Sequence, residues 1–354
     1  MTKTKTNGAR DERAGADYAD FETAFDAARA DGMFRAVGSL YDANGHLGDR
    51  WIVLLDHLAE AGRSNLNLGR LLEGHANAVQ LVRLYGNGDQ QARLDRTLAQ
   101  DAILGVWGAD GAPPACVEIG DANQPVLMGS KRYASGLGIL SHAVVPVARE
   151  GGVLQLYLVP ASEPSRQDVS KWAMSGMRES ASGGFSLDQI PADETTILGA
   201  PGVYKTEPFF EGGIWRCAGV HVGAIEAIVR LMARHLEASQ RIDHPLQAER
   251  LGHAIMHART ARLWVEDAAR RIEAPGKGQA ITHAVAIASY ARLQVESDAL
   301  AVMELARRSV GLASFETGNL LDAVVADLSV YLRQANPDAL LLHKCRAMAA
   351  EYLS

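Results

Sequence analysis

The stretch from Trp172 to Gly199, WAMSGMRESASGGFSLDQIPADETTILG, says most about the fold of this chain. It carries in order an Arg-x-Ser triplet, an apolar run, an Ile-Pro pair and a Leu-Gly pair, at Arg178–Ser180, Gly184–Ile190, Ile190–Pro191 and Leu198–Gly199. A short apolar run bounded by Gly and Pro is typical of a strand. The stretch therefore predicts a strand that follows the Arg-x-Ser triplet.

The composition is that of a globular protein. With 354 residues, 47% of them hydrophobic and 22% charged, the chain is long enough for two or three packed units. Its net charge of -7 argues against a nucleic-acid partner. No run reaches the ~18 apolar residues of a membrane span, and the polar residues 1–17 predict a disordered tail and no signal peptide. We expect a soluble, cytoplasmic protein.

No pattern of metal ligands stands out. The three cysteines, Cys116, Cys217 and Cys345, are far apart and lack the spacing of a zinc site or a disulfide framework, so we expect free thiols and no metal. His253 and His257 are four apart, but the Glu of an HExxH motif is missing. Solvated histidines are the simpler interpretation.

The hydrophobic pattern predicts an α+β protein with three parts. Residues 18–100 are helical, with Trp51, Leu54, Leu55 and Leu58 on one face. Residues 101–200 hold five short apolar runs separated by Gly, Pro and Asp, which predict a β-barrel or sandwich. Residues 201–354 carry long periods rich in Ala and Leu, which suit an antiparallel helix bundle.

This order of parts and the 172–199 stretch together resemble the acyl-CoA dehydrogenase superfamily, from about Phe21 onward. The resemblance implies an FAD-dependent oxidoreductase that removes hydrogen from the α and β carbons of an acyl thioester on CoA or a carrier protein. It also implies an electron acceptor or oxygen as co-substrate. Ala- and Leu-rich helices with more than one apolar face predict a homodimer or homotetramer packed through the bundle.

The resemblance also places the flavin. The family's first flavin motif falls on Trp107, Gly108 and Ala109, where the backbone would contact the isoalloxazine although the usual hydroxyl is missing. The second falls on residues 131–136, KRYASG, which is similar to the aromatic-Ala-Ser-Gly version of flavin monooxygenases with this fold. There Tyr133, Ala134 and Ser135 would contact the flavin, with Ser135 donating to N5.

Three further positions follow from the same resemblance. Arg178 and Ser180 match the family's Gly-x-Arg-Gly-Ser turn, and we expect them to contact the flavin. Arg241, in QRIDHPL, lies one residue from the position whose Arg meets the FAD pyrophosphate of a neighbouring subunit in the family.

The usual catalytic carboxylate is absent. The Glu of the family's Tyr-Glu-Gly-Thr motif falls on Ala335, which cannot act as a base. Some members place the Glu at the start of the first bundle helix, and Glu211 lies within two residues of that position, beside Phe209 and Phe210. Glu211 is therefore the predicted base, and an ordinary helix-start acid is the alternative.

Two other functions stay open from the sequence. A flavin monooxygenase or oxidase of the same fold fits the missing Glu and the Tyr-Ala-Ser-Gly motif. A non-catalytic scaffold subunit would also lack the base.

Overall fold

The computed structural model describes residues 18–274, 278–334, 337–349 and 352–353. Five helices come first in the chain: α1 (Phe21–Ala30), α2 (Met33–Gly38), α3 (Trp51–Ser64), α4 (Leu66–Tyr85) and α5 (Gly88–Ala99). Helix α4 begins where the side chain of Asn65 accepts from the N–H groups of Asn67 and Leu68. Fourteen of its twenty residues are buried, because α4 packs against β1, α3 and α6 at once.

The strands between Ile103 and Leu198 form three small sheets. The first has the order β1-β5-β6-β10, the second β2-β3-β9 and the third β4-β8-β7. Their bounds are Ile103–Val106 (β1), Cys116–Ile119 (β2), Pro125–Met128 (β3), Ser130–Ala134 (β4), Leu140–Ala148 (β5), Leu154–Pro160 (β6), Gln167–Asp168 (β7), Gly183–Ser186 (β8), Ile190–Pro191 (β9) and Ile197–Leu198 (β10). Strand β1 runs parallel to β5, which pairs antiparallel with β6.

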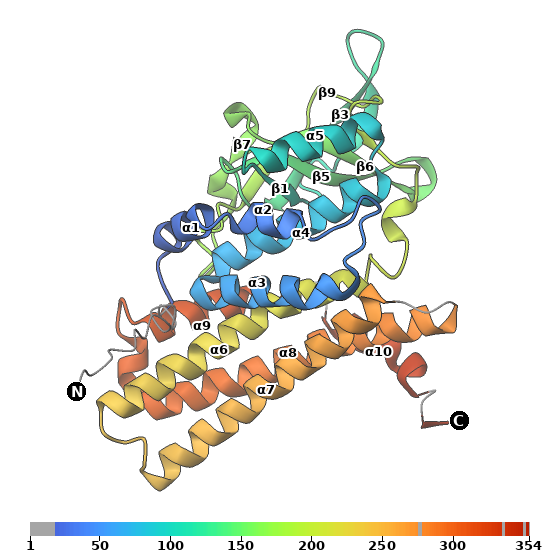
Figure 1. The fold of residues 1–354 in the computed structure, drawn as a ribbon. Helices are drawn as coiled ribbons and strands as arrows, with labels where there is room; N and C mark the ends of the chain where they lie inside the picture. The colour runs from blue at the N-terminus through green and yellow to red at the C-terminus, as the bar shows by residue number, and fades with distance from the viewer. Residues whose placement is uncertain (1–17, 275–277, 335–336, 350–351, 354) are drawn as a thin grey trace, which may run out of the picture.

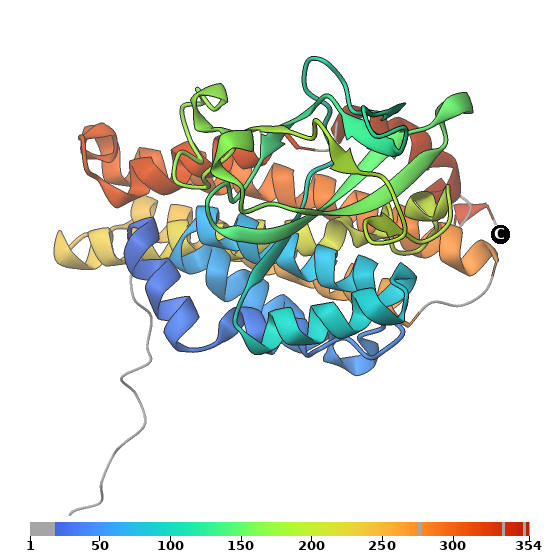
Figure 2. The same ribbon diagram turned by 90° about the horizontal axis from the view of Figure 1, so that it is seen from above.

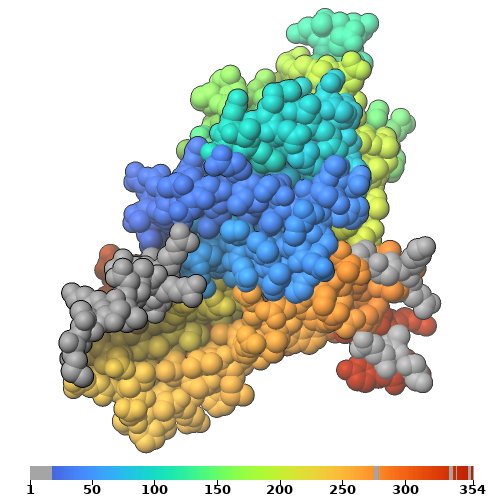
Figure 3. Space-filling model, in the orientation of Figure 1, coloured from blue at the N-terminus to red at the C-terminus, as the bar shows by residue number. Residues whose placement is uncertain are grey.

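The rest of the chain is helical. It contains α6 (Trp215–Ala238), α7 (Pro245–Glu273), α8 (Gln279–Val310), α9 (Leu320–Tyr331) and α10 (Pro337–Ala349). Helices α3 and α4 lie between the strands and this bundle (Figure 1), and the sheets extend across the helices when seen from above (Figure 2). The space-filling view shows the same sequence of layers, with the blue helices between the green strands and the orange bundle (Figure 3).

Helices α3 and α6 approach each other backbone to backbone. A Cβ at Gly223 would lie 2.0 Å from the carbonyl oxygen of Ala59, and one at Gly62 would lie 2.1 Å from that of Val220. Only glycine fits at such distances, so these residues fix the separation of the two helices. The small residues of α6 thus serve a partner helix.

One half-buried carboxylate joins the three parts of the chain. Asp327 on α9 accepts from the hydroxyl of Tyr18 (2.8 Å), the side-chain amide of Asn67 (3.0 Å) and the N–H of Met177 (2.5 Å). These partners come from the segment before α1, from α4 and from the loop before β8. Asp327 therefore holds α9 against both walls of the cavity described below.

The predicted α+β fold, with a helical part, then a β-part, then a helical bundle, is confirmed, and the β-part consists of three small sheets. Helix changes to strand between Ala99 and Ile103, and strand to helix between Leu198 and Trp215. The predicted tail at residues 1–17 lies outside the described residues.

Within the described part, no helix is long and apolar enough to cross a membrane, and no three His, Cys, Asp or Glu side chains gather as metal ligands. All three cysteines are free, and of them only Cys217 is buried.

Candidate functional site

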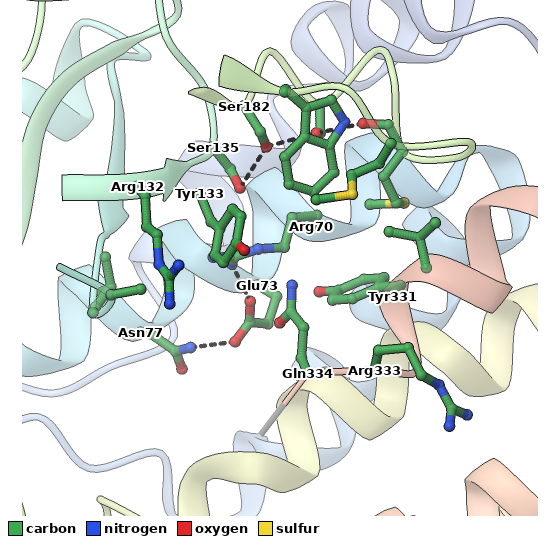
Figure 4. A pocket seen from close by; sticks show the side chains of 18 of the residues that line it. Arg70, Glu73, Asn77, Arg132, Tyr133, Ser135, Ser182, Tyr331, Arg333 and Gln334 are labelled. Atoms are coloured by element: carbon green, nitrogen blue, oxygen red, sulfur yellow. Dashed lines mark hydrogen bonds and ion pairs between the residues drawn. The ribbon is translucent and has the colours of Figure 1, made fainter. Parts of the chain in front are cut away.

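Two adjoining cavities lie between the sheets, α4 and the end of α9. The main cavity has a volume of about 940 Å³, and the side cavity has a volume of about 410 Å³. They share five lining residues, so they form one continuous space: Glu73, Asn77, Val106, Tyr204 and Gln334. Figure 4 shows that the side chains of α4 and of the end of α9 face each other across it.

The backbone after β1 forms one wall of the main cavity. Gly108 and Ala109 line it, and among the hydrogen bonds of the described residues none engages their N–H groups. A Cβ at Gly108 would meet no atom within 4 Å, so this backbone faces open space. Two unpaired N–H groups beside a cavity are donors available to a ligand.

Three serines continue this wall. Ser180 donates to the carbonyl of Met177 (2.7 Å) and its hydroxyl lies 2.7 Å from that of Ser182. Ser182 donates to the hydroxyl of Ser135 (3.0 Å; Figure 4). With Ser182 as that donor, the proton of the Ser135 hydroxyl remains for a ligand in the main cavity.

Aromatic rings stand at the edge of the main cavity. Tyr133 has a left-handed backbone (φ 56°), which turns its ring out of the strand. The ring packs edge-on against Trp172, with the centroids 6.0 Å apart, and the guanidinium of Arg132 lies 4.9 Å from its centre. The indole N–H of Trp172 lines the cavity and has no partner among the described residues.

The opposite wall carries a buried chain of charges. On α4, Glu73 accepts from Arg70 (2.5 Å) and from the side-chain amide of Asn77 (Figure 4). The Asn77 oxygen accepts from Arg216 Nε (2.6 Å), and Arg216 pairs with Glu273 (3.2 Å). Burial raises the pKa of Glu273, and the Arg216 charge opposes that shift. The two ion pairs balance each other, so the wall is polar but neutral.

Some of the predicted flavin residues line the main cavity, and others lie outside it. Five line the main cavity: Gly108, Ala109, Tyr133, Ser135 and Ser180. Trp107 and Ala134 are buried behind that wall. Trp107 gives its backbone N–H to Val144 (3.0 Å) and its indole N–H to the carbonyl of Ser135 (2.9 Å). Its side chain therefore orients Ser135 from behind.

The two predicted arginines lie outside both cavity linings. Arg178 is exposed, and its Nε donates to the carbonyl of Met174 (3.3 Å). Arg241 stays within its own turn, where it donates to Ser239 (3.1 Å) and lies 2.9 Å from a ring nitrogen of His235.

The predicted base, Glu211, lines the side cavity but is neither free nor desolvated. Its carboxylate pairs with Lys344, and its side chain is 38% exposed. Phe209 packs on His46 and Phe210 on Tyr204, so the two rings do not enclose the carboxylate. The sequence places Glu211 beside Phe209 and Phe210, but these side chains turn to other partners and leave its carboxylate in contact with solvent. Ala335, the usual position of the base, lies outside the described residues.

No family model matches the chain. In sequence, it is 22% identical over 177 residues to the dibenzothiophene monooxygenase of Rhodococcus qingshengii, and the match covers 45% of this chain and 41% of that relative. The chain thus spans under half of the curated relative's length.

Solved structures match almost the whole chain. The butyryl-CoA dehydrogenase of Megasphaera elsdenii superposes with a TM-score of 0.74 at 13% identity, covering 94% of this chain and all of that one. The protein has the acyl-CoA dehydrogenase fold. Two oxygenases also superpose on it: FMN-bound TdsC of Paenibacillus sp. A11-2 (TM-score 0.80, 15% identity, 92% and 90% covered) and methanesulfinate monooxygenase of Pseudomonas fluorescens (0.77, 18%, 94% and 91%).

Within the acyl-CoA dehydrogenase fold, sequence reasoning missed the α4 side of the cavity. Arg70, Glu73 and Asn77 recur at i, i+3 and i+7, so they share one face of α4. Polar residues that share one face of a largely apolar helix can be recognised from the sequence. Charged residues are rarely buried without a partner or a function, so this stripe could have marked the site.

Proposed function

We propose that the protein is a flavin-dependent monooxygenase, in which the main cavity holds the flavin and part of the substrate. The observation that carries the proposal is that the two walls of the main cavity differ in their polar groups. One offers the free N–H groups of Gly108 and Ala109 and the Ser135 hydroxyl. On the other, every carboxylate is already tied to a cation. The likeness to TdsC and to methanesulfinate monooxygenase supports it.

The wall after β1 fits a flavin ring. Gly108 and Ala109 would lie against the ring, and Ser135 would donate to the nitrogen that gains electron density on reduction. The unpaired indole N–H of Trp172 is a further donor at the same cavity. The resemblance of the sequence implies FAD, whereas the TdsC structure carries FMN. Binding experiments should therefore compare the two.

The chemistry of the bound group would be the transfer of one atom of dioxygen to the substrate, while the other leaves as water and the reduced flavin is oxidised. The residues of this chain would supply binding and exclusion of water. Arg70 and Asn77 would hold the Glu73 carboxylate in a fixed position. Tyr204 and Val106, which line both cavities, would contact the bound molecules.

Dehydrogenation of an acyl thioester is the function that the cavity supports less well. That reaction needs a free carboxylate beside the α-carbon. In the described part of the two cavities, Glu73 is held by Arg70 and Asn77, and Glu211 is held by Lys344. A cavity without a free carboxylate is also compatible with a non-catalytic scaffold subunit, which is the remaining alternative.

One experiment separates the three functions. The purified protein is titrated with FMN and FAD, and the loaded protein is then reduced chemically and exposed to ¹⁸O₂ with a panel of sulfur and ring compounds. We expect flavin binding and one ¹⁸O atom in a product. If the protein binds neither flavin, the scaffold subunit is the function that remains. Anaerobic bleaching of the oxidised flavin by an acyl-CoA would establish the dehydrogenase instead.

We also propose a homodimer or homotetramer packed through the helical bundle. On α7, Ile255, Met256 and Leu263 are 52%, 64% and 49% exposed. Exposed apolar side chains gathered on one helix are typical of an interface. Light scattering at micromolar concentration should give a multiple of 37.9 kDa. A monomer that still holds flavin tightly would contradict this proposal.

A further inference from the structure

We propose that Tyr331 is a specificity-determining residue that donates a hydrogen bond to the substrate, and that Tyr331 and Glu73 together select an apolar ring compound with one hydroxyl group. The inference rests on the proposed function only in that the main cavity is the place of reaction. Its evidence is the state of the Tyr331 side chain and of the groups around it.

The Tyr331 hydroxyl is buried without a partner. Tyr331 is 1% exposed. The Cys217 thiol lies beside its hydroxyl, but no group within the described residues makes a hydrogen bond of good geometry with it. It lines the main cavity, and its oxygen points toward Glu73 and Gln334 (Figure 4). Buried hydroxyls in native proteins nearly always have a partner, because leaving one unpaired destabilises the fold. A ligand in the cavity would supply the missing acceptor.

The surroundings hold the ring in place and keep its proton. The ring of His221 packs edge-on against that of Tyr331 at 4.6 Å, and His221 in turn lies 3.7 Å from the Cys217 sulfur. Burial, and then the nearby Cys217 and Glu73, raise the pKa of Tyr331 well above its ordinary value. The thiol is only a weak acceptor. Tyr331 therefore faces the cavity as a fixed donor.

Glu73 complements this donor with an acceptor. Each of its oxygens takes one hydrogen bond, from Arg70 and from Asn77, and a carboxylate oxygen can accept a second. A hydroxyl group both donates and accepts, so it can bond to Glu73 and to Tyr331 at once. The charges of the wall are already paired within the protein. A neutral ligand group is therefore favoured over a charged one.

The side cavity defines the body of the ligand. Its wall is largely aromatic and aliphatic, from Leu81, Tyr204, Phe209, Phe210 and Ile214. Rings of this kind stack on flat apolar molecules. A ring compound whose hydroxyl reaches Glu73 and Tyr331 would place its body among these side chains.

A matched pair of ligands and a matched pair of variants test the proposal. The ligands are 2-naphthol and naphthalene, which differ by the hydroxyl alone, and binding is measured by calorimetry with and without FMN. The variants are Tyr331→Phe and Ser329→Ala. Ser329 lines the same cavity from α9, but its hydroxyl is satisfied by the carbonyl of Val325 (2.6 Å).

We expect the wild type to bind 2-naphthol about tenfold more tightly than naphthalene. Tyr331→Phe should lose about tenfold for 2-naphthol and nothing for naphthalene, and Ser329→Ala should change neither. Because the lost hydroxyl is unpaired in the free protein, Tyr331→Phe should melt at the wild-type temperature or above it. A purely structural hydroxyl would lower the melting temperature instead.

The proposal is overturned if the wild type does not bind 2-naphthol, if it does not distinguish the two ligands, or if Tyr331→Phe keeps the wild-type ratio. These outcomes are separate from a failure of the proposed function. A protein that binds no flavin, yet shows the Tyr331-dependent preference without it, would disprove the monooxygenase and retain the inference.

Discussion

At the scale of single residues, the cavity depends on which polar groups are left without partners. Ser135 keeps its hydroxyl proton because Ser182 donates to it, and its carbonyl is fixed from behind by Trp107. Glu73, by contrast, is already engaged twice. The same cavity thus holds donors without protein acceptors on the β-wall and a carboxylate fixed by two protein donors on the helical wall.

The role of Ser135 can be measured directly. A hydrogen bond to a ligand contributes about 0.5–1.5 kcal/mol, so Ser135→Ala should weaken flavin binding by roughly three- to tenfold. Fluorescence quenching on titration with FMN or FAD measures the Kd. Ser165→Ala is the control, because its exposed hydroxyl contacts only Glu163. Equal affinity in Ser135→Ala and wild type would show that the hydroxyl does not reach the flavin.

At the scale of elements, His75 joins three of them. The N–H of Leu104 on β1 donates to its Nδ1 (3.2 Å), so Nε2 carries the proton and donates to the carbonyl of Phe34 on α2 (3.0 Å). Only the neutral ring can make both bonds, because protonation would place a hydrogen on Nδ1 against the Leu104 N–H. Burial lowers the pKa of His75 to about 4.

This pKa predicts how stability depends on pH. The folded value lies below the ordinary value of about 6.5, so the stabilisation is complete above pH 6.5 and is lost as the pH falls toward 4. The loss amounts to about 3 kcal/mol. Urea unfolding at pH 7 and pH 4.5 measures it. His75→Gln should flatten the dependence, whereas the exposed His253→Gln should not; identical slopes for wild type and His75→Gln would refute the assignment.

The contact between α3 and α6 gives a second prediction for elements. Gly223→Ala would bring a Cβ to within 2.0 Å of the Ala59 carbonyl, so we expect a loss of about 3 kcal/mol or a failure to fold. Gly252→Ala on α7 is the matched control, since its Cβ would meet nothing within 4 Å. Alanine is the better helix former, so this variant should gain up to about 1 kcal/mol. Denaturant midpoints compare the two, and equal midpoints would contradict the close approach.

At the scale of the whole molecule, Asp327 connects parts that are far apart in sequence. Asp327→Ala would leave the Tyr18 hydroxyl, the Asn67 amide and the Met177 N–H without their acceptor. We expect a loss of about 3 kcal/mol and weaker flavin binding, because α9 and the loop before β8 both line the main cavity. Asp322→Ala, at the exposed start of α9, should cost under about 1 kcal/mol. Similar losses of stability in both variants would show that the hydrogen bonds of Asp327 do not stabilise the fold.

The sequence predicted the elements better than the site. The apolar period of residues 65–85 predicted a helix, and α4 spans Leu66–Tyr85. Such a helix can be predicted because the spacing of its own apolar residues is enough to indicate it. The cavity depends instead on which distant side chains meet. Arg70 and Tyr331 are ordinary helix residues in sequence, and only the packing of α4 against α9 makes them neighbours of one space. Glu211 likewise gains its partner, Lys344, from a helix over a hundred residues away.

The glycine contact between α3 and α6 also bears on how substrates of different size could be accommodated over evolution. The atoms that exclude a side chain at Gly62 and Gly223 belong to the backbone, so no compensating substitution can make room for one. A relative with larger residues at these positions must hold α6 farther from α3. Because Arg216 and Cys217 on α6 line the side cavity, that outward step would reshape it. The residues at these two positions in an alignment therefore indicate how wide the side cavity is in each relative.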